Sequence, residues 1–119
     1  YKTLVQLSFT NLFSEASRVL FEKELKAALK EALKTPVQGY IAAQEGMKQR
    51  LDTQAFLPTA PFQKLFIIGK KDTVLEYQDL QNEAQQTQSD SVVLDQGHMS
   101  HIENKTEVIA VLTSFLKKC

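Results

Sequence analysis

Two stretches decide the fold of this chain: Leu65-Phe66-Ile67-Ile68-Gly69-Lys70-Lys71-Asp72 and Ser91-Val92-Val93-Leu94-Asp95-Gln96-Gly97-His98. The first begins with a continuous apolar run, Leu65 to Ile68, which is typical of a parallel strand buried on both faces, and the second begins with a short strand, Ser91 to Leu94. Each run leads through a short turn to a side chain that carries chemistry, Asp72 in the first stretch and His98 in the second. Because reactive groups collect at the carboxyl ends of parallel strands, we expect Asp72 and His98 to lie within hydrogen-bonding reach.

A helix is predicted after each strand. The polar stretch from Leu75 to Gln86 predicts the first helix. Asn104, with Glu107 three residues later, has the form of a capping box that starts the second. This order predicts a β-α-β-α unit with right-handed connections and a parallel sheet. The predicted fold class is therefore α/β.

The composition changes near Pro58 and Pro61, and this change divides the chain into two segments. Residues 1–57 are predicted to form a helical segment. Residues 58–119 are predicted to form the β-α-β-α unit.

Three helical stretches are predicted within the first segment. Residues 1–13 have the pattern of a helix end followed by a turn. Ser14 is predicted to cap a helix that runs to about Lys34. Thr35-Pro36-Val37-Gln38 has the form of a capping box with proline at the first helical position, which predicts a further helix to about Arg50.

The overall composition is that of an ordinary globular domain. Of 119 residues, 43% are hydrophobic and 24% are charged. Fourteen Lys and Arg balance fourteen Asp and Glu, and no basic stripe is present. We therefore expect no nucleic-acid partner and no membrane partner held by charge. No apolar run is long enough to span a bilayer.

Cysteine usage and the first residues bear on the cellular compartment. A single cysteine, Cys119, cannot form an intramolecular disulfide, so the sequence has no signature of an oxidising compartment. No signal peptide is visible, and we expect a cytoplasmic protein. The chain begins at Tyr1 rather than at methionine, which predicts that its true start lies further upstream.

The predicted sheet has too few strands. Parallel sheets need several neighbouring strands and helices on both faces, and two strands leave half of their hydrogen-bonding groups unpaired. We expect the remaining strands to come from a missing N-terminal half of the fold or from a partner chain.

Asp72 and His98 have the chemistry of an acid–base pair. An ionised aspartate that accepts the Nδ1–H of histidine fixes the tautomer and leaves Nε2 free to take a proton from a nucleophile. Plainer interpretations are a turn or cap role for Asp72 and a loop histidine without catalytic function. His101 lies three residues after His98, but no third ligand is evident and no metal site is predicted. Glu103 is predicted to help start the last helix.

The stretch from Pro61 to Leu116 resembles the C-terminal end of the α/β-hydrolase fold family. In that family, one strand ends in a G-x-x-D turn that carries the acid of a Ser-His-Asp triad. The next strand is followed by a Gly-His pair that carries the triad histidine. Gly69-Lys70-Lys71-Asp72 and Gly97-His98-Met99 match these two motifs.

The resemblance implies a role for each matching residue. Asp72 is the implied triad acid and His98 the implied general base. Met99 is implied to lie beside the histidine, near the pocket for the acyl or leaving group. The implied activity is hydrolysis of a carboxylic ester or related acyl bond, without a cofactor.

The helical stretch from Asn11 to Arg50 resembles the lid, or cap, of the same family. An apolar cap lining that includes Leu4, Phe9, Phe13 and Met47 would fit a small hydrophobic ester or acyl substrate. Phe13 and Met47, with Met99, are thus the predicted substrate-binding residues. The alternative for these cap residues is that they pack in a core.

One part of the family's machinery is missing from these residues. No serine stands in a G-x-S-x-G elbow, and the oxyanion-hole loop is absent as well. We therefore expect a fragment of a serine-type hydrolase that supplies the acid and the histidine but is inactive alone.

Two other functions fit parts of the sequence. A non-catalytic interaction module would pair with a partner chain through its exposed sheet edge. A small nucleotide-binding unit is the third interpretation, but the sequence has no glycine-rich phosphate loop.

Overall fold

A computed structural model describes residues 1–119. The elements in chain order are α1 (Lys2–Asn11), α2 (Glu15–Leu20), α3 (Glu22–Ala32), α4 (Val37–Gln49), the 3-10 helix η1 (Leu57–Thr59), β1 (Leu65–Gly69), α5 (Tyr77–Gln86), β2 (Asp90–Leu94), α6 (Ser100–Glu103) and α7 (Lys105–Leu116). The fold is mixed α/β, with seven α-helices and a two-stranded parallel sheet, as the sequence predicts at this level.

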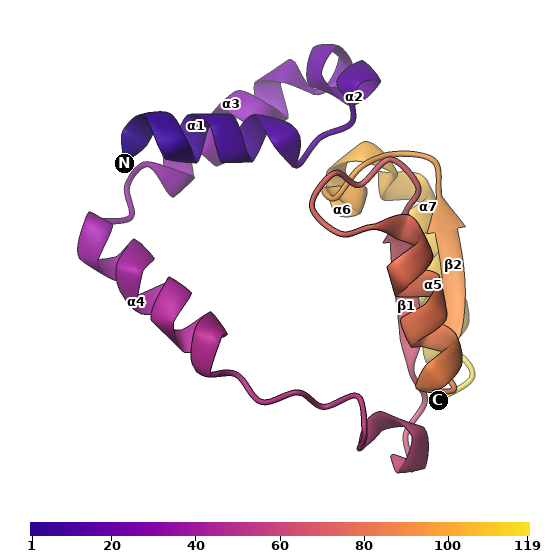
Figure 1. The fold of residues 1–119 in the computed structure, drawn as a ribbon. Helices are drawn as coiled ribbons and strands as arrows, with labels where there is room; N and C mark the ends of the chain where they lie inside the picture. Colours follow the sequence, from indigo (N-terminus) through magenta and orange to yellow (C-terminus); the bar gives the residue numbers. More distant parts are fainter.

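The sheet forms where the two apolar runs were predicted to be strands. β1 pairs in parallel with β2, with Leu65 opposite Asp90 and Gly69 opposite Leu94. Helix α5 covers one face of the sheet and α7 lies along the other (Figure 1). Ile68 is fully buried between these layers. Cover on both faces fits the continuous apolar run of β1, whereas β2 begins with the exposed residues Asp90 and Ser91.

Both outer edges of this sheet are unpaired, because β1 and β2 pair only with each other. The outward side of α7 is also apolar, with Ile109, Leu112 and Leu116 all exposed. A two-stranded sheet is marginally stable, and exposed strand edges pair readily with other strands. The β-α-β-α unit therefore presents one apolar helix side and two free strand edges to any neighbouring chain segment.

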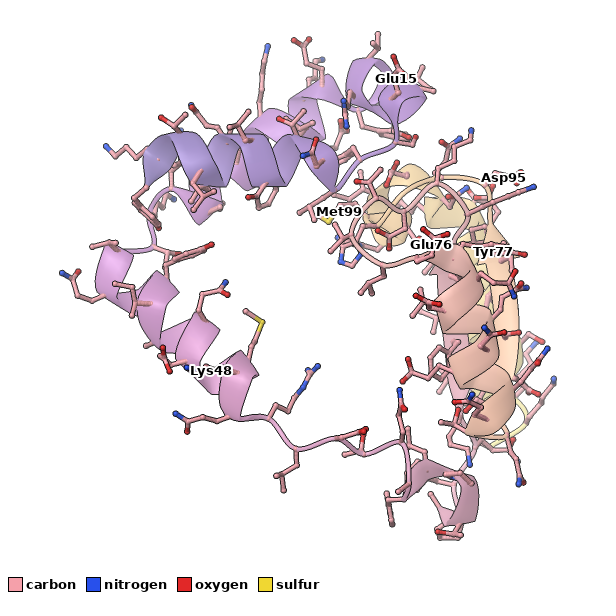
Figure 2. The ribbon with its side chains drawn as sticks, viewed as in Figure 1. Glu15, Lys48, Glu76, Tyr77, Asp95 and Met99 are labelled. Carbon is pink, nitrogen blue, oxygen red and sulfur yellow. The ribbon has the colours of Figure 1, made fainter.

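The helical segment curves away from the sheet and makes an open ring (Figure 1). The radius of gyration is 16.1 Å, whereas a compact chain of this length has a value of about 13–14 Å. Lys48 on α4 and Tyr77 on α5 lie on opposite sides of the opening (Figure 2). Helices α3 and α4 bury no residue. The segment is therefore held by few contacts, most of them where the α1–α2 connection meets the β-α-β-α unit.

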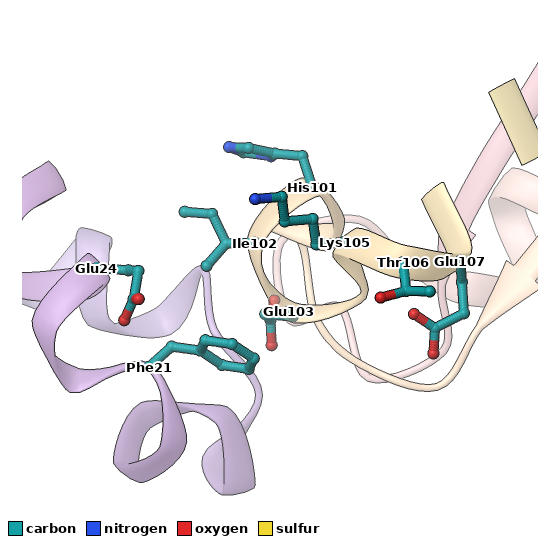
Figure 3. Close-up of a pocket in the computed structure, with 8 residues that line it drawn as sticks. All are labelled: Phe21, Glu24, His101, Ile102, Glu103, Lys105, Thr106 and Glu107. Atoms are coloured by element: carbon teal, nitrogen blue, oxygen red, sulfur yellow. The ribbon is translucent and has the colours of Figure 1, made fainter. Parts of the chain in front are cut away.

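The predicted helix from Ser14 to Lys34 is interrupted. Ser14 caps α2 as predicted, since its side chain accepts the N–H of Ser17. The chain then leaves the helical conformation at Phe21 (φ −112°, ψ 34°) and starts again as α3. The break directs Phe21 towards Ile102 and Glu103 of α6 (Figure 3). The break has no counterpart in the helical periodicity, which is why the sequence does not predict it.

Both predicted capping boxes are wrong. Pro36, not Thr35, is the cap residue of α4 (ψ 152°), so the threonine side chain lies one residue too early to cap the helix. Asn104 is the N-cap residue of α7, as predicted, but its side chain makes no cap bond, so the capping box does not form. Its backbone N–H donates to the carbonyl of Ser100 (2.8 Å). Asn104 is thus both the last cap of α6 and the first cap of α7, at φ −129°.

The predicted boundary after residue 57 falls within η1, and the division into two domains remains a prediction.

On the exposed side of α3, a hydrogen bond from Lys26 lowers the pKa of Glu22 below its usual value. No helix combines the length and the apolar character that crossing a membrane requires.

The 119-residue chain alone is expected to self-associate, because its strand edges and the outward side of α7 are uncovered. Light scattering after size exclusion should report species larger than a monomer. Leu116→Lys should shift the population towards monomer, because it places a charge on the apolar helix side. Val19→Lys is the matched control, since Val19 is exposed on α2. A monomer that unfolds cooperatively would contradict this expectation.

Candidate functional site

Asp72 and His98, together called the dyad below, lie in contact at the carboxyl ends of the two strands. Because a carboxylate only accepts hydrogen bonds, the Nδ1–H of His98 donates to Oδ2 of Asp72, at 2.7 Å. The Asp72 side chain is 4% exposed and that of His98 is 35% exposed. The sequence prediction that these two side chains meet is confirmed, whereas a catalytic role for them stays a prediction.

The second oxygen of Asp72 fixes the orientation of its carboxylate. Oδ1 accepts the backbone N–H groups of Val74 (2.7 Å) and Leu75 (3.1 Å). The Asp72 side chain therefore both stabilises the turn and binds the histidine, two roles that the sequence offers as alternatives. A carboxylate held on both oxygens presents Oδ2 to the imidazole in one fixed direction.

His98 is held through its backbone as well as through its ring. Its N–H donates to the carbonyl of Leu12 at the end of α1 (2.9 Å). The contact with Asp72 selects the neutral tautomer that carries its proton on Nδ1. No residue of the chain hydrogen-bonds to Nε2. His98 therefore presents a free acceptor nitrogen on a partly exposed ring, as a general base requires.

Two glycines allow close backbone approaches at the histidine loop (Gln96–Met99): Gly69 that of the acid loop (Gly69–Asp72), and Gly97 that of the α1–α2 connection. A Cβ at Gly69 would overlap the backbone carbonyl of Gly97 and lie 2.9 Å from that of Gln96. A Cβ at Gly97 would lie 2.7 Å from the backbone nitrogen of Ser14. These contacts are tighter than any side-chain carbon tolerates, and the neighbours are backbone atoms that cannot turn aside. Glycine is therefore required at position 69 for the approach of the two loops, and at position 97 for the approach of the α1–α2 connection to the histidine loop.

The three predicted substrate-binding residues lie in different surroundings. Met99 follows His98 directly, is half-buried, and lies at the inner rim of the ring (Figure 2). Phe13 is fully buried, so its side chain packs as a core residue, the alternative that the sequence left open. Met47 is exposed on α4, the helix that lies across the opening from α5 (Figure 1). The chain does not bring Phe13, Met47 and Met99 together into one pocket.

His101 lies apart from the acid–base pair. It is exposed and lines a hollow of about 440 Å³ between the α2–α3 turn and the α6–α7 region (Figure 3). No three side chains of the metal-ligating types His, Cys, Asp and Glu gather anywhere in the chain. None of the hollows on the surface is lined by Asp72 or His98.

No serine of the chain is hydrogen-bonded to His98. Ser100 donates instead to the carbonyl of Gly97 (3.2 Å). Ser14 and Ser17 are buried, and their hydroxyls donate to Oε1 of Gln96 at 2.6 and 3.4 Å. The acid and the base are therefore assembled without a nucleophile in contact.

Two residues around the histidine loop have structural roles that the sequence analysis missed. Glu103 was predicted to start a helix, but its buried carboxylate accepts three backbone N–H groups, two of them beside His98. Gln96 was assigned no role, but it binds both buried serines. No sequence signal points to these contacts, since both residue types usually lie at the surface.

Comparison with known proteins adds no relative. The chain matches no protein-family model, and no curated protein matches it.

Gly69→Ala is expected to break the acid–histidine pair, because the added methyl group overlaps the Gly97 carbonyl and forces the two loops apart. Overpacking of this kind costs about 1–3 kcal/mol in the free energy of unfolding. In nuclear magnetic resonance spectra, the low-field Nδ1–H signal of His98 should be lost.

Gly46→Ala is the matched control for this substitution. Gly46 lies within α4, and a Cβ there meets no atom within 4 Å. Alanine should stabilise the helix by about 0.5–1 kcal/mol and leave the His98 signal unchanged. An unaltered His98 signal in Gly69→Ala would show that the loops do not depend on this close approach.

Proposed function

We propose that this chain carries the acid and the base of a serine-type α/β-hydrolase, with the nucleophilic serine on a segment outside these 119 residues. The observation that carries the proposal is the 2.7 Å contact between His98 Nδ1 and Asp72 Oδ2 at the ends of adjacent parallel strands. The free Nε2 of His98 and the doubly held carboxylate of Asp72 support it.

The proposed reaction is transfer of an acyl group to the serine and then to water. Nε2 of His98 takes the proton of the serine hydroxyl as its oxygen attacks the substrate carbonyl, and then gives that proton to the leaving group. Asp72 keeps the imidazole in the required tautomer and stabilises the imidazolium that forms. Donors for the oxyanion come from the same outside segment as the serine, and the chain is inactive without them.

The proposed substrate is a small hydrophobic carboxylic ester or related acyl compound. Met99 follows the base directly in the chain, and the helical segment joins the β-α-β-α unit beside the histidine turn, where Leu12 accepts the N–H of His98. The exposed apolar residues of that segment, Leu4, Leu7, Ile41 and Met47, provide the hydrophobic surface that such a substrate needs. Residues 1–57 are proposed to be the cap and residues 58–119 the end of the hydrolase core.

A non-catalytic interaction module is the second candidate, and the unpaired sheet edges favour it. In this case β1 or β2 would accept a strand of a partner chain. Completion of the sheet by a partner serves both proposals, so activity of the completed protein decides between them.

In the full-length protein that contains these residues, Asp72→Asn is expected to lower kcat for an ester such as p-nitrophenyl butyrate by about 10⁴-fold, because the amide favours the wrong histidine tautomer. His98→Ala should lower kcat at least as far, because it removes the base. A fluorophosphonate probe should label one serine in the unmodified protein, and the label should depend on His98.

His101→Ala is the matched control, since it removes the neighbouring exposed histidine and leaves the dyad intact. It should retain kcat within a small factor. Equal ester hydrolysis by all three variants, or none by the unmodified protein, would reject the hydrolase proposal and favour the interaction module.

A further inference from the structure

Glu103 is an unusual residue to find buried. Its side chain belongs to the four-residue helix α6, and the residue is 7% exposed. A carboxylate withdrawn from water is costly unless hydrogen bonds or an opposite charge compensate it. No Lys, Arg or His side chain pairs with Glu103. Its compensation comes from the backbone alone.

Three backbone N–H groups converge on this carboxylate. Oε2 accepts from Ser14 (2.9 Å) and from Gly97 (3.2 Å), and Oε1 accepts from Met99 (3.0 Å). Gly97 and Met99 are the residues on either side of His98. One carboxylate therefore fixes the chain immediately before and immediately after the histidine.

The N–H of His98 itself is bound to the carbonyl of Leu12. All three consecutive amides of the Gly97–Met99 turn are thus held, two by Glu103 and one by the α1–α2 connection. A loop held at every N–H keeps its side chain in one direction, and this orientation is what the contact between Asp72 and the imidazole needs.

The same carboxylate also reaches the helical segment. Ser14, whose N–H it accepts, follows the fully buried Phe13 in the α1–α2 connection. The hydroxyls of Ser14 and Ser17 continue the network to Gln96, just before the histidine turn. Glu103 therefore joins the helical segment to the turn that carries the base.

We propose that Glu103 is a positioning residue that holds His98 in its catalytic orientation and couples this orientation to the helical segment. The inference rests on the proposed hydrolase function for its kinetic part. Its geometric part, the placement of the imidazole by Glu103, is independent of any activity.

The role requires acceptors on both side-chain oxygens. In Glu103→Gln, one oxygen becomes an NH₂ donor that faces either Met99 N–H or the pair from Ser14 and Gly97. Whichever way the amide turns, at least one N–H beside His98 or at Ser14 loses its acceptor. Aspartate keeps the charge and both acceptors but is one methylene shorter, so Glu103→Asp should fall between glutamine and glutamate.

The test compares the unmodified full-length protein with Glu103→Gln, Glu103→Asp and Glu107→Gln. Glu107→Gln is the matched control. Glu107 and Glu103 both line the hollow beside His101, but Glu107 is exposed and binds no backbone N–H (Figure 3). For Glu103→Gln we expect kcat for the ester to fall by about 10- to 100-fold with KM little changed. We also expect a broadened or lost low-field Nδ1–H signal of His98. The control should alter neither readout, and Glu103→Asp should recover part of both.

The readouts separate failure of this inference from failure of the proposed function. Loss of the His98 signal in Glu103→Gln supports the positioning role even where no ester is hydrolysed. A folded Glu103→Gln with the original signal and kcat overturns it. If Glu103→Gln does not fold, the unmodified protein decides by hydrogen exchange: protected amides at Ser14, Gly97 and Met99 support the role, and amides that exchange as freely as those of an open loop overturn it.

Discussion

The close approach of the two strand ends is the constraint on which the rest of this structure depends. The parallel pairing continues beyond the strands, since Lys70 N–H donates to Leu94 O (2.8 Å) and Lys71 N–H donates to Gln96 O (2.9 Å). These bonds draw the two loops so close that a Cβ at Gly69 would overlap the backbone carbonyl of Gly97. Asp72 and His98 meet because the backbone brings them together, and their hydrogen bond adds to a geometry already fixed by the sheet.

The same sheet leaves its outer edges open. The helical segment does not cover them, because it joins the β-α-β-α unit at the dyad end and then leads away around the ring (Figure 1). Polar backbone groups on an open edge stay bonded to water or pair with another strand. Contacts within the chain thus hold Asp72 and His98 in place, whereas the strand edges are unpaired and the outward side of α7 is exposed.

The sequence predicts those parts of the fold that depend on local pattern. Both strands, the helix over Tyr77–Gln86 and the contact of Asp72 with His98 follow from apolar runs and from the rule that parallel strand ends gather reactive groups. The break at Phe21 has no counterpart in the helical periodicity. The Ser14–Glu103 bond joins residues 89 positions apart, and neither residue type signals it. Tertiary contacts of this kind override propensity, and a single sequence does not contain them in readable form.

The dyad itself distinguishes the two proposed functions in physical terms. An interaction module needs an exposed edge, and nothing in strand pairing calls for an aspartate withdrawn to 4% exposure and held at both oxygens. Burial of a carboxylate is unfavourable, and the Asp72 carboxylate is compensated by three hydrogen bonds, from Val74, Leu75 and His98. A general base requires this alignment, together with an unoccupied Nε2. The buried, aligned carboxylate therefore favours the proposed acyl-transfer function over the proposed interaction module.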